Sequence, residues 1–108
     1  MGQNRSSDFR DASSSNLLMY GTIGSSVVSI TSLTGYDAAL VNRAVRCTIT
    51  ARVGGAMFTY DGTSPTTTKG HFLGADKNIQ VAGSDNISRL KFIREAATSA
   101  ELTITIEE

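Results

Sequence analysis

The stretch RAVRCTITARV at 43–53 decides the fold class, because its residues alternate as those of a β-strand do. Every second position is apolar, and arginine or threonine stands between. A period of two with one apolar and one polar side is typical of a strand that covers a core with one face. We therefore predict a strand here whose inward side chains are those of Val45, Cys47, Ile49, Ala51 and Val53.

The chain from residue 16 onward has the same character, with many serines and threonines and a preference for valine and isoleucine at apolar positions. We expect 56–60 to form the return strand of 45–53, and 89–95 to pair with 101–107 across the short linker. The segment 34–43 stays open between a loop and a short helical turn at Ala38, Ala39 and Leu40. The further strands are expected at 17–23, 26–32, 71–73 and 78–82.

Two smaller segments are expected to be turns. The segment 83–88 is a turn, or a single helical turn capped by Ser84 or Asp85. Further upstream, Asp61 and Gly62 supply turn residues of positive φ, and Pro65 stops the residues after it from pairing as an interior strand. These turns separate strands; they do not form the Gly-rich loop that opens a helix in phosphate-binding proteins.

About seven or eight short strands with turn residues between them predict an all-β fold. We expect a single small antiparallel β-sandwich or barrel, Ig-like or jelly-roll-like, with an extended N-terminal arm. A chain of 108 residues is one domain by length. The domain organisation is therefore a polar arm at 1–16 and a β-sandwich domain at 17–108.

The arm is polar and rich in serine, and Phe9 is its one aromatic residue, between alternating arginine and aspartate. Such a segment buries too little apolar surface to offset its own ordering entropy. We expect it to become ordered against a partner protein. The candidate contact residues are Asn4, Arg5, Asp8, Phe9, Arg10 and Asp11.

The charges exclude some partners. Ten basic and ten acidic residues give a net charge of zero, which argues against nucleic acid, since that binding is driven by clustered Lys and Arg. No run of apolar residues approaches the ~20 needed to cross a bilayer, so no membrane partner is expected. Two basic sets have the spacing of solvated strand faces: Arg43, Arg46 and Arg52, and then Arg89, Lys91 and Arg94.

No catalytic or metal constellation is expected. The one cysteine, Cys47, cannot form an intramolecular disulfide and is expected to be a buried thiol. The one histidine, His71, is interpreted as a half-buried strand residue, because no serine lies in a nucleophile elbow. Asp61, Asp76 and Asp85 lie in expected loops without the spacing of a calcium loop. We expect no enzyme, no cofactor, no metal and no small-molecule substrate.

Three segments carry a family resemblance: MFTYDGTSPTTTKGHFL at 57–73, NIQVAGSDNISRLKFIR at 78–94 and AELTITI at 100–106. In this order they resemble a class of small virion proteins encoded by tailed bacteriophages and prophages. The resemblance covers about half of the chain, and the arm has no part in it. It implies a non-enzymatic structural component of the particle with no catalytic residues, located in the virion and assembled in the host cytoplasm.

The resemblance favours a capsid decoration (cement) protein that bridges neighbouring capsomers. Its expected partners are the major capsid protein or other virion proteins, and copies of itself in a homo-oligomer. The alternative within the same class is a head-tail connector, collar or tail component. The Tyr-Asp-Gly-Thr-x-Pro-Thr piece at 60–66 also resembles Ig-like modules of bacterial carbohydrate-active enzymes, which suggests a carbohydrate-binding module with Tyr36 and Tyr60 as candidate stacking residues.

Overall fold

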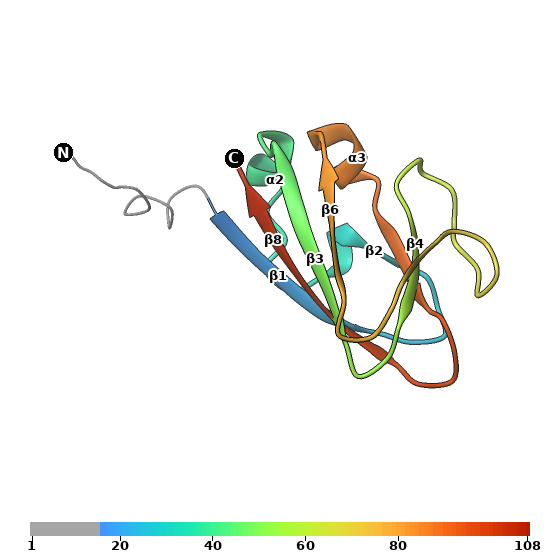
Figure 1. The fold of residues 1–108 in the computed structure, drawn as a ribbon. Coiled ribbons are helices and arrows are strands. Elements are labelled where there is room, and N and C mark those ends of the chain that lie inside the picture. Colours follow the sequence, from blue (N-terminus) through green and yellow to red (C-terminus); the bar gives the residue numbers. More distant parts are fainter. Residues whose placement is uncertain (1–15) are drawn as a thin grey trace.

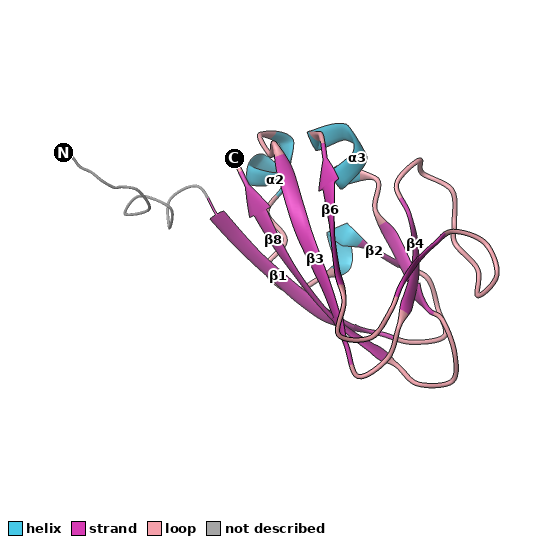
Figure 2. Ribbon diagram, viewed as in Figure 1, coloured by secondary structure: helices cyan, strands magenta, loops and turns pink. Residues whose placement is uncertain are grey.

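The alternating runs of the sequence form eight β-strands in the computed structural model, which describes residues 16–108. One 3₁₀ helix, η1, and two short α-helices, α2 and α3, lie between strands (Figure 2). The bounds of the elements are β1 (Asn16–Ile23), β2 (Val28–Ser29), η1 (Ile30–Ser32), α2 (Ala38–Asn42), β3 (Arg46–Arg52), β4 (Ala56–Thr59), β5 (His71–Leu73), β6 (Asn78–Ala82), α3 (Ser84–Ser88), β7 (Lys91–Arg94) and β8 (Ala100–Glu107).

The strands form two antiparallel sheets of four strands that pack as a β-sandwich, as predicted. Sheet A has the order β1-β8-β3-β6 and sheet B the order β2-β7-β4-β5. Consecutive strands lie in opposite sheets, except that β4 and β5 are neighbours in sheet B. This order is that of an eight-stranded jelly roll. It excludes the Ig-like alternative, in which the first two strands are neighbours in one sheet.

Two predicted strand pairings are wrong. β4 is not the return strand of β3, and β7 does not pair with β8, because each connection carries the chain from one sheet to the other. β8 instead lies between β1 and β3 with a continuous antiparallel register on both sides. A short linker is therefore compatible with a change of sheet as well as with a hairpin, and the alternating pattern is the same in both cases.

The two sheets lie close together where short loops join the strands, and diverge toward the end that carries α2 and α3 (Figure 1). The helices pack against each other, and each inserts one buried residue, Val41 or Ile87, at this end of the core. Asp37 begins α2 by accepting hydrogen bonds from the backbone N–H groups of Ala39 and Leu40. Of the two alternatives left open for this segment, the helical turn at 38–40 is the one that forms, as part of α2.

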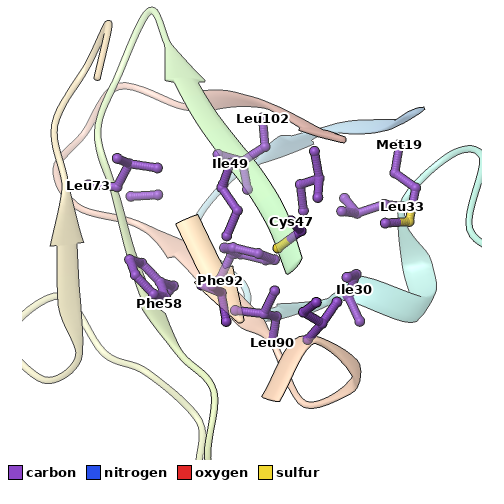
Figure 3. Close-up of a cluster of buried hydrophobic side chains, with 14 of the residues drawn as sticks. Met19, Ile30, Leu33, Cys47, Ile49, Phe58, Leu73, Leu90, Phe92 and Leu102 are labelled. Carbon is purple, nitrogen blue, oxygen red and sulfur yellow. The ribbon is translucent and has the colours of Figure 1, made fainter. Parts of the chain in front are cut away.

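The core lies between the inner faces of the sheets. Phe58 of β4 and Phe92 of β7 are its largest side chains, and their ring centroids are 6.3 Å apart. Cys47 and Ile49 reach the same cluster from sheet A (Figure 3). These side chains are almost fully removed from water, and burial of each large apolar side chain stabilises the fold by about 1.5–3 kcal/mol.

The inward row predicted for 43–53 is confirmed at its centre and wrong at its ends. Cys47, Ile49 and Ala51 are fully buried, whereas Val45 is 61% and Val53 62% exposed. β3 begins at residue 46 and ends at residue 52, so both valines flank the strand, although the backbone of Val45 still forms hydrogen bonds with Glu107 and Gly83. The alternation of apolar and polar residues in the sequence therefore extends one residue beyond each end of the strand.

Two local predictions are also corrected. The expected strand at 26–32 is a strand only at β2, after which η1 places the buried Ile30 in the core. α3 forms where one helical turn was expected, but neither Ser84 nor Asp85 is its capping residue. Gly83 occupies that position, with φ 92°, and makes no side-chain hydrogen bond.

Candidate functional site

The outer face of sheet A carries a regular array of threonines. Thr48 of β3 lies opposite Thr105 of β8, and Thr50 lies opposite Thr103. Their strand neighbours point into the core, so these four side chains point outward and are partly exposed. We call these four threonines with Leu18 and Tyr20 the threonine face. The pairing register gives this surface its weakly polar character, because it places the threonines opposite one another and side chains opposite each other on one sheet face lie close together.

Leu18 and Tyr20 extend the threonine face across β1. Leu18 lies opposite Thr105 and Tyr20 opposite Thr103, so the same rows continue onto the edge strand. Leu18 is 55% and Tyr20 52% exposed, while Met19 between them is fully buried. A shallow hollow of about 290 Å³ lies beside these two side chains. Two large apolar groups together on an otherwise polar surface are typical of a protein-binding surface.

The edge of β1 next to this face is partly closed by backbone hydrogen bonds. The N–H of Tyr20 donates to the carbonyl of Thr34 at 3.0 Å, and the N–H of Thr34 donates to the carbonyl of Tyr20 at 2.9 Å. A partner strand therefore cannot pair with β1 at this point without displacing Thr34. At this point the threonine face therefore presents side chains, and the strand edge beside it is not open.

Charged residues surround the threonine face in pairs. The Nε of Arg46 donates to Glu107 at 2.7 Å, and Arg43 forms an ion pair with Glu108. Arg52 lies opposite Glu101 in the register. The basic set of 43–52 thus stands beside carboxylates, and such exposed pairs contribute about 0–1 kcal/mol each to stability. The expectation that nucleic acid is not a partner stays a prediction.

The β4–β5 loop, residues 60–70, forms a groove of about 730 Å³. Tyr60, Asp61 and His71 all line it. Asp61 Oδ1 accepts hydrogen bonds from the backbone N–H of Thr63 at 3.0 Å and from its hydroxyl at 2.6 Å. These hydrogen bonds hold the pKa of the Asp61 carboxyl below its usual range. The turn at this point is confirmed, with Gly62 at φ 92° and Asp61 outside the left-handed region.

The remaining candidates from the sequence are placed as follows. The strand assignment of His71 is confirmed, but its side chain is exposed rather than half-buried, because β5 is an edge strand. Cys47 is buried as predicted, and burial raises the pKa of its thiol to about 11. Tyr36 packs partly against the core, whereas Tyr60 is exposed. Within residues 16–108, no three His, Cys, Asp or Glu side chains gather as metal ligands would.

The predicted arm contacts lie outside the described residues, so the structure places none of them: Asn4, Arg5, Asp8, Phe9, Arg10 and Asp11. We did not predict from the sequence that Leu18 and Tyr20 would be exposed side by side on one sheet face. A signal for them was present, because LLMYGTI at 17–23 has large apolar residues on both faces of a strand. A strand that covers the core with one face leaves such residues exposed on the other.

Comparisons with protein-family models, with curated proteins and with solved structures found no match to this chain. In the described part of the chain, none of the helices has the length and apolar character needed to cross a membrane.

Proposed function

We propose that this protein is a non-enzymatic structural component of a bacteriophage particle, most specifically a capsid decoration protein that bridges neighbouring capsomers. The support from sequence is the resemblance of 57–106 to small virion proteins of tailed phages. The jelly roll supports it at the level of fold analogy, because viral capsid and lectin domains are among the proteins that use this fold.

The observation that carries the proposal is the position of the threonine face. It includes Leu18 and Tyr20 on β1, and residues 1–15 directly precede this strand in the chain. The arm and the face can therefore contact one partner as a continuous surface. Each contact is modest, but many copies on a symmetric shell multiply weak individual affinities by avidity. The partner we propose is the major capsid protein.

The test is co-sedimentation with purified, undecorated capsid shells. The full chain is compared with a chain that lacks residues 1–15 and with the double variant Leu18→Asp, Tyr20→Asp. We expect both changes to abolish or greatly weaken binding, while circular dichroism shows an intact fold. Val45→Asp is the matched control, because Val45 is similarly exposed but precedes β3 and is not part of the threonine face. Undiminished binding of both altered chains would refute the proposal.

Copy number separates the decoration protein from the connector, collar or tail alternative. A decoration protein occupies the shell in on the order of hundreds of copies, whereas a connector ring has about a dozen subunits. Quantitative gel densitometry of purified particles measures this ratio. If the particle contains only about a dozen copies, the protein is a connector, collar or tail component and not a decoration protein.

The proposal includes self-association. β5 and β6 are edge strands of opposite sheets, and edge strands present backbone groups to which another copy can pair. Sedimentation velocity across a range of concentrations measures the oligomeric state. We expect a species larger than the monomer, and a strictly monomeric protein on and off the shell would contradict this part.

A further inference from the structure

Three aromatic rings follow one another at the start of the β4–β5 loop, the first pair tilted by 40° and the second pair stacked. Phe58 and His71 are register partners, and their ring centroids are 5.4 Å apart. The rings of His71 and Tyr60 are 5.2 Å apart and inclined by only 15°. His71 thus lies between the other two rings, and Tyr60 is the terminal ring of the three. Tyr60 has one face against His71, and its side chain remains 37% exposed.

The loop beyond Tyr60 is fixed by its own hydrogen bonds. The hydroxyl of Thr59 donates to the carbonyl of Thr63 at 2.5 Å, and Lys91 Nζ donates to the carbonyl of Gly62 at 3.1 Å. Pro65 is buried, although the residues on either side of it are exposed. A site whose walls are already ordered loses little conformational entropy when a ligand binds. The Tyr60 ring and the Asp61 carboxylate are therefore held in place before any ligand arrives.

The groove combines one aromatic ring with polar groups at its border. Its volume of about 730 Å³ lies within the range of small-ligand sites. Asp61 Oδ1 takes both hydrogen bonds from Thr63, and a carboxylate has acceptor positions on both oxygens. Within residues 16–108, no donor contacts its Oδ2. Lys69 and Ser64 line the same groove and can donate to a ligand.

We propose that this groove binds a neutral pyranose sugar. A pyranose has a patch of C–H groups on one ring face and hydroxyls around its edge. The C–H face stacks on the exposed part of the Tyr60 ring, and ring hydroxyls donate to Asp61 Oδ2 and accept from Lys69. The sugar is neutral, because Asp61 and Lys69 already balance each other's charge in the groove, and an acidic sugar would add a second carboxylate beside Asp61.

The groove and the threonine face are separate surfaces. β1 lies at one side of the molecule, and the β4–β5 loop, which follows β4, projects at the other side (Figure 1). A protein attached through the arm and β1 would keep the groove accessible. Sugar binding does not rest on the proposed capsid role, and either can fail without the other.

The test is a titration of the full ¹⁵N-labelled chain with methyl glycosides of glucose, mannose and galactose, with N-acetylglucosamine, and with N-acetylneuraminic acid as the acidic member. We expect saturable shifts of the 60–71 amides for at least one neutral sugar, with a dissociation constant in roughly the millimolar range. Tyr60→Ala should weaken binding by roughly three- to tenfold, the loss of one stacking contact. Tyr60→Phe should retain it.

Asp61→Asn is the second variant, because its amide oxygen can still accept from Thr63 and keep the loop folded. We expect it to weaken sugar binding, while capsid-shell binding is unchanged. Tyr20→Ala is the matched control, since Tyr20 is an exposed tyrosine on the other side of the molecule. No saturable shift with any sugar, a preference for the acidic sugar, or equal affinity of Tyr60→Ala and wild type would overturn the proposal.

Discussion

At the scale of single residues, the two ends of β3 show that an apolar residue at an inward position of the sequence pattern is not always buried. Val45 and Val53 continue the apolar alternation of β3, yet both are exposed, because they lie just beyond the two ends of the strand, where the inner face of the sheet no longer covers them. Val53 in addition has φ 72°, and Val53 and Asp76 are the non-glycine residues with positive φ in the described chain. For a β-branched residue this conformation is strained.

We predict opposite effects of glycine at these two valines. Val53→Gly removes the strain of a left-handed valine, about 1–2 kcal/mol, at an entropic cost of about 0.5–1 kcal/mol. The free energy of unfolding should therefore rise by up to about 1 kcal/mol. Val45→Gly carries only the entropic cost and should lower it by about 0.5–1 kcal/mol. Urea unfolding followed by circular dichroism measures both, and an equal loss in the two variants would contradict the assigned strain.

Cys47 makes stability depend on pH in the alkaline range. Its thiol is buried, which raises its pKa from 9.0 to about 11 in the folded protein. Above pH 9 the unfolded chain loses this proton while the folded chain keeps it. The stabilisation present below pH 9 is therefore lost as the pH rises toward 11, by roughly 2–3 kcal/mol in total.

The measurement is the free energy of unfolding of wild type and of Cys47→Ala between pH 8 and 11. The variant should show the smaller decline, because the thiol that titrates has been removed. The absolute stability of the variant is lower, so the comparison rests on the slope alone. Parallel slopes would show that Cys47 does not contribute.

At the scale of elements, the outer edge of β1 is covered by the segment that follows η1. Thr34 forms two backbone hydrogen bonds with Tyr20, and Gly35 then turns the chain with φ 91°. A Cβ atom at position 35 would lie 2.5 Å from the carbonyl oxygen of Leu18. The close approach of this segment to β1 thus requires glycine. It also keeps an edge strand from pairing with other chains.

Gly35→Ala and Gly62→Ala form a matched pair that tests this contact. Both glycines have φ near +90°, so both variants pay about 1–2 kcal/mol of backbone strain. A Cβ at Gly62 meets nothing within 4 Å, whereas one at Gly35 meets the backbone of β1. We expect Gly35→Ala to be the more destabilising by at least about 1 kcal/mol, and the amide of Tyr20 to lose hydrogen-exchange protection. Equal losses of stability in the two variants would show that the segment at Thr34 can move away from β1 without cost.

At the scale of the whole molecule, the jelly roll makes strands distant in sequence depend on one another. β8 lies inside sheet A, between β1 and β3, and its inner face contributes four fully or almost fully buried side chains. The two small helices close the wider end of the sandwich, and the β4–β5 loop lies on the side opposite β1 (Figure 1). A protein bound at β1 would therefore leave the β4–β5 loop on the other side uncovered.

Deletion of residues 100–108 should prevent folding. It removes Leu102, Ile104 and Ile106 from the core, each worth about 1.5–3 kcal/mol, and leaves β1 and β3 without their shared neighbour. The total approaches the whole stability of a small domain, about 5–15 kcal/mol. Deletion of Glu108 alone removes one exposed ion pair with Arg43 and should cost at most about 1 kcal/mol. Amide dispersion in an NMR spectrum distinguishes the two outcomes.

The sequence by itself determined the class of the fold and the centre of the core. The strict alternation through Cys47 and Ile49 was sufficient, because side-chain direction along a strand is a local property with a period of two. The same local reasoning placed the turn at Asp61 and Gly62, and it named a helical turn at 38–40 as one of two alternatives. Each of these features depends on residues within a few positions of one another.

The tertiary structure alone decided which strands pair, where the buried row ends and which aromatic rings meet. Pairing in a jelly roll depends on loops that change sheets, and the alternation of a strand is the same whichever sheet it joins. Tyr60 and His71 stack only because β4 and β5 return to the same sheet. Leu18 and Tyr20 become a surface for the same reason: their strand meets the core on one face, and the fold leaves the other exposed.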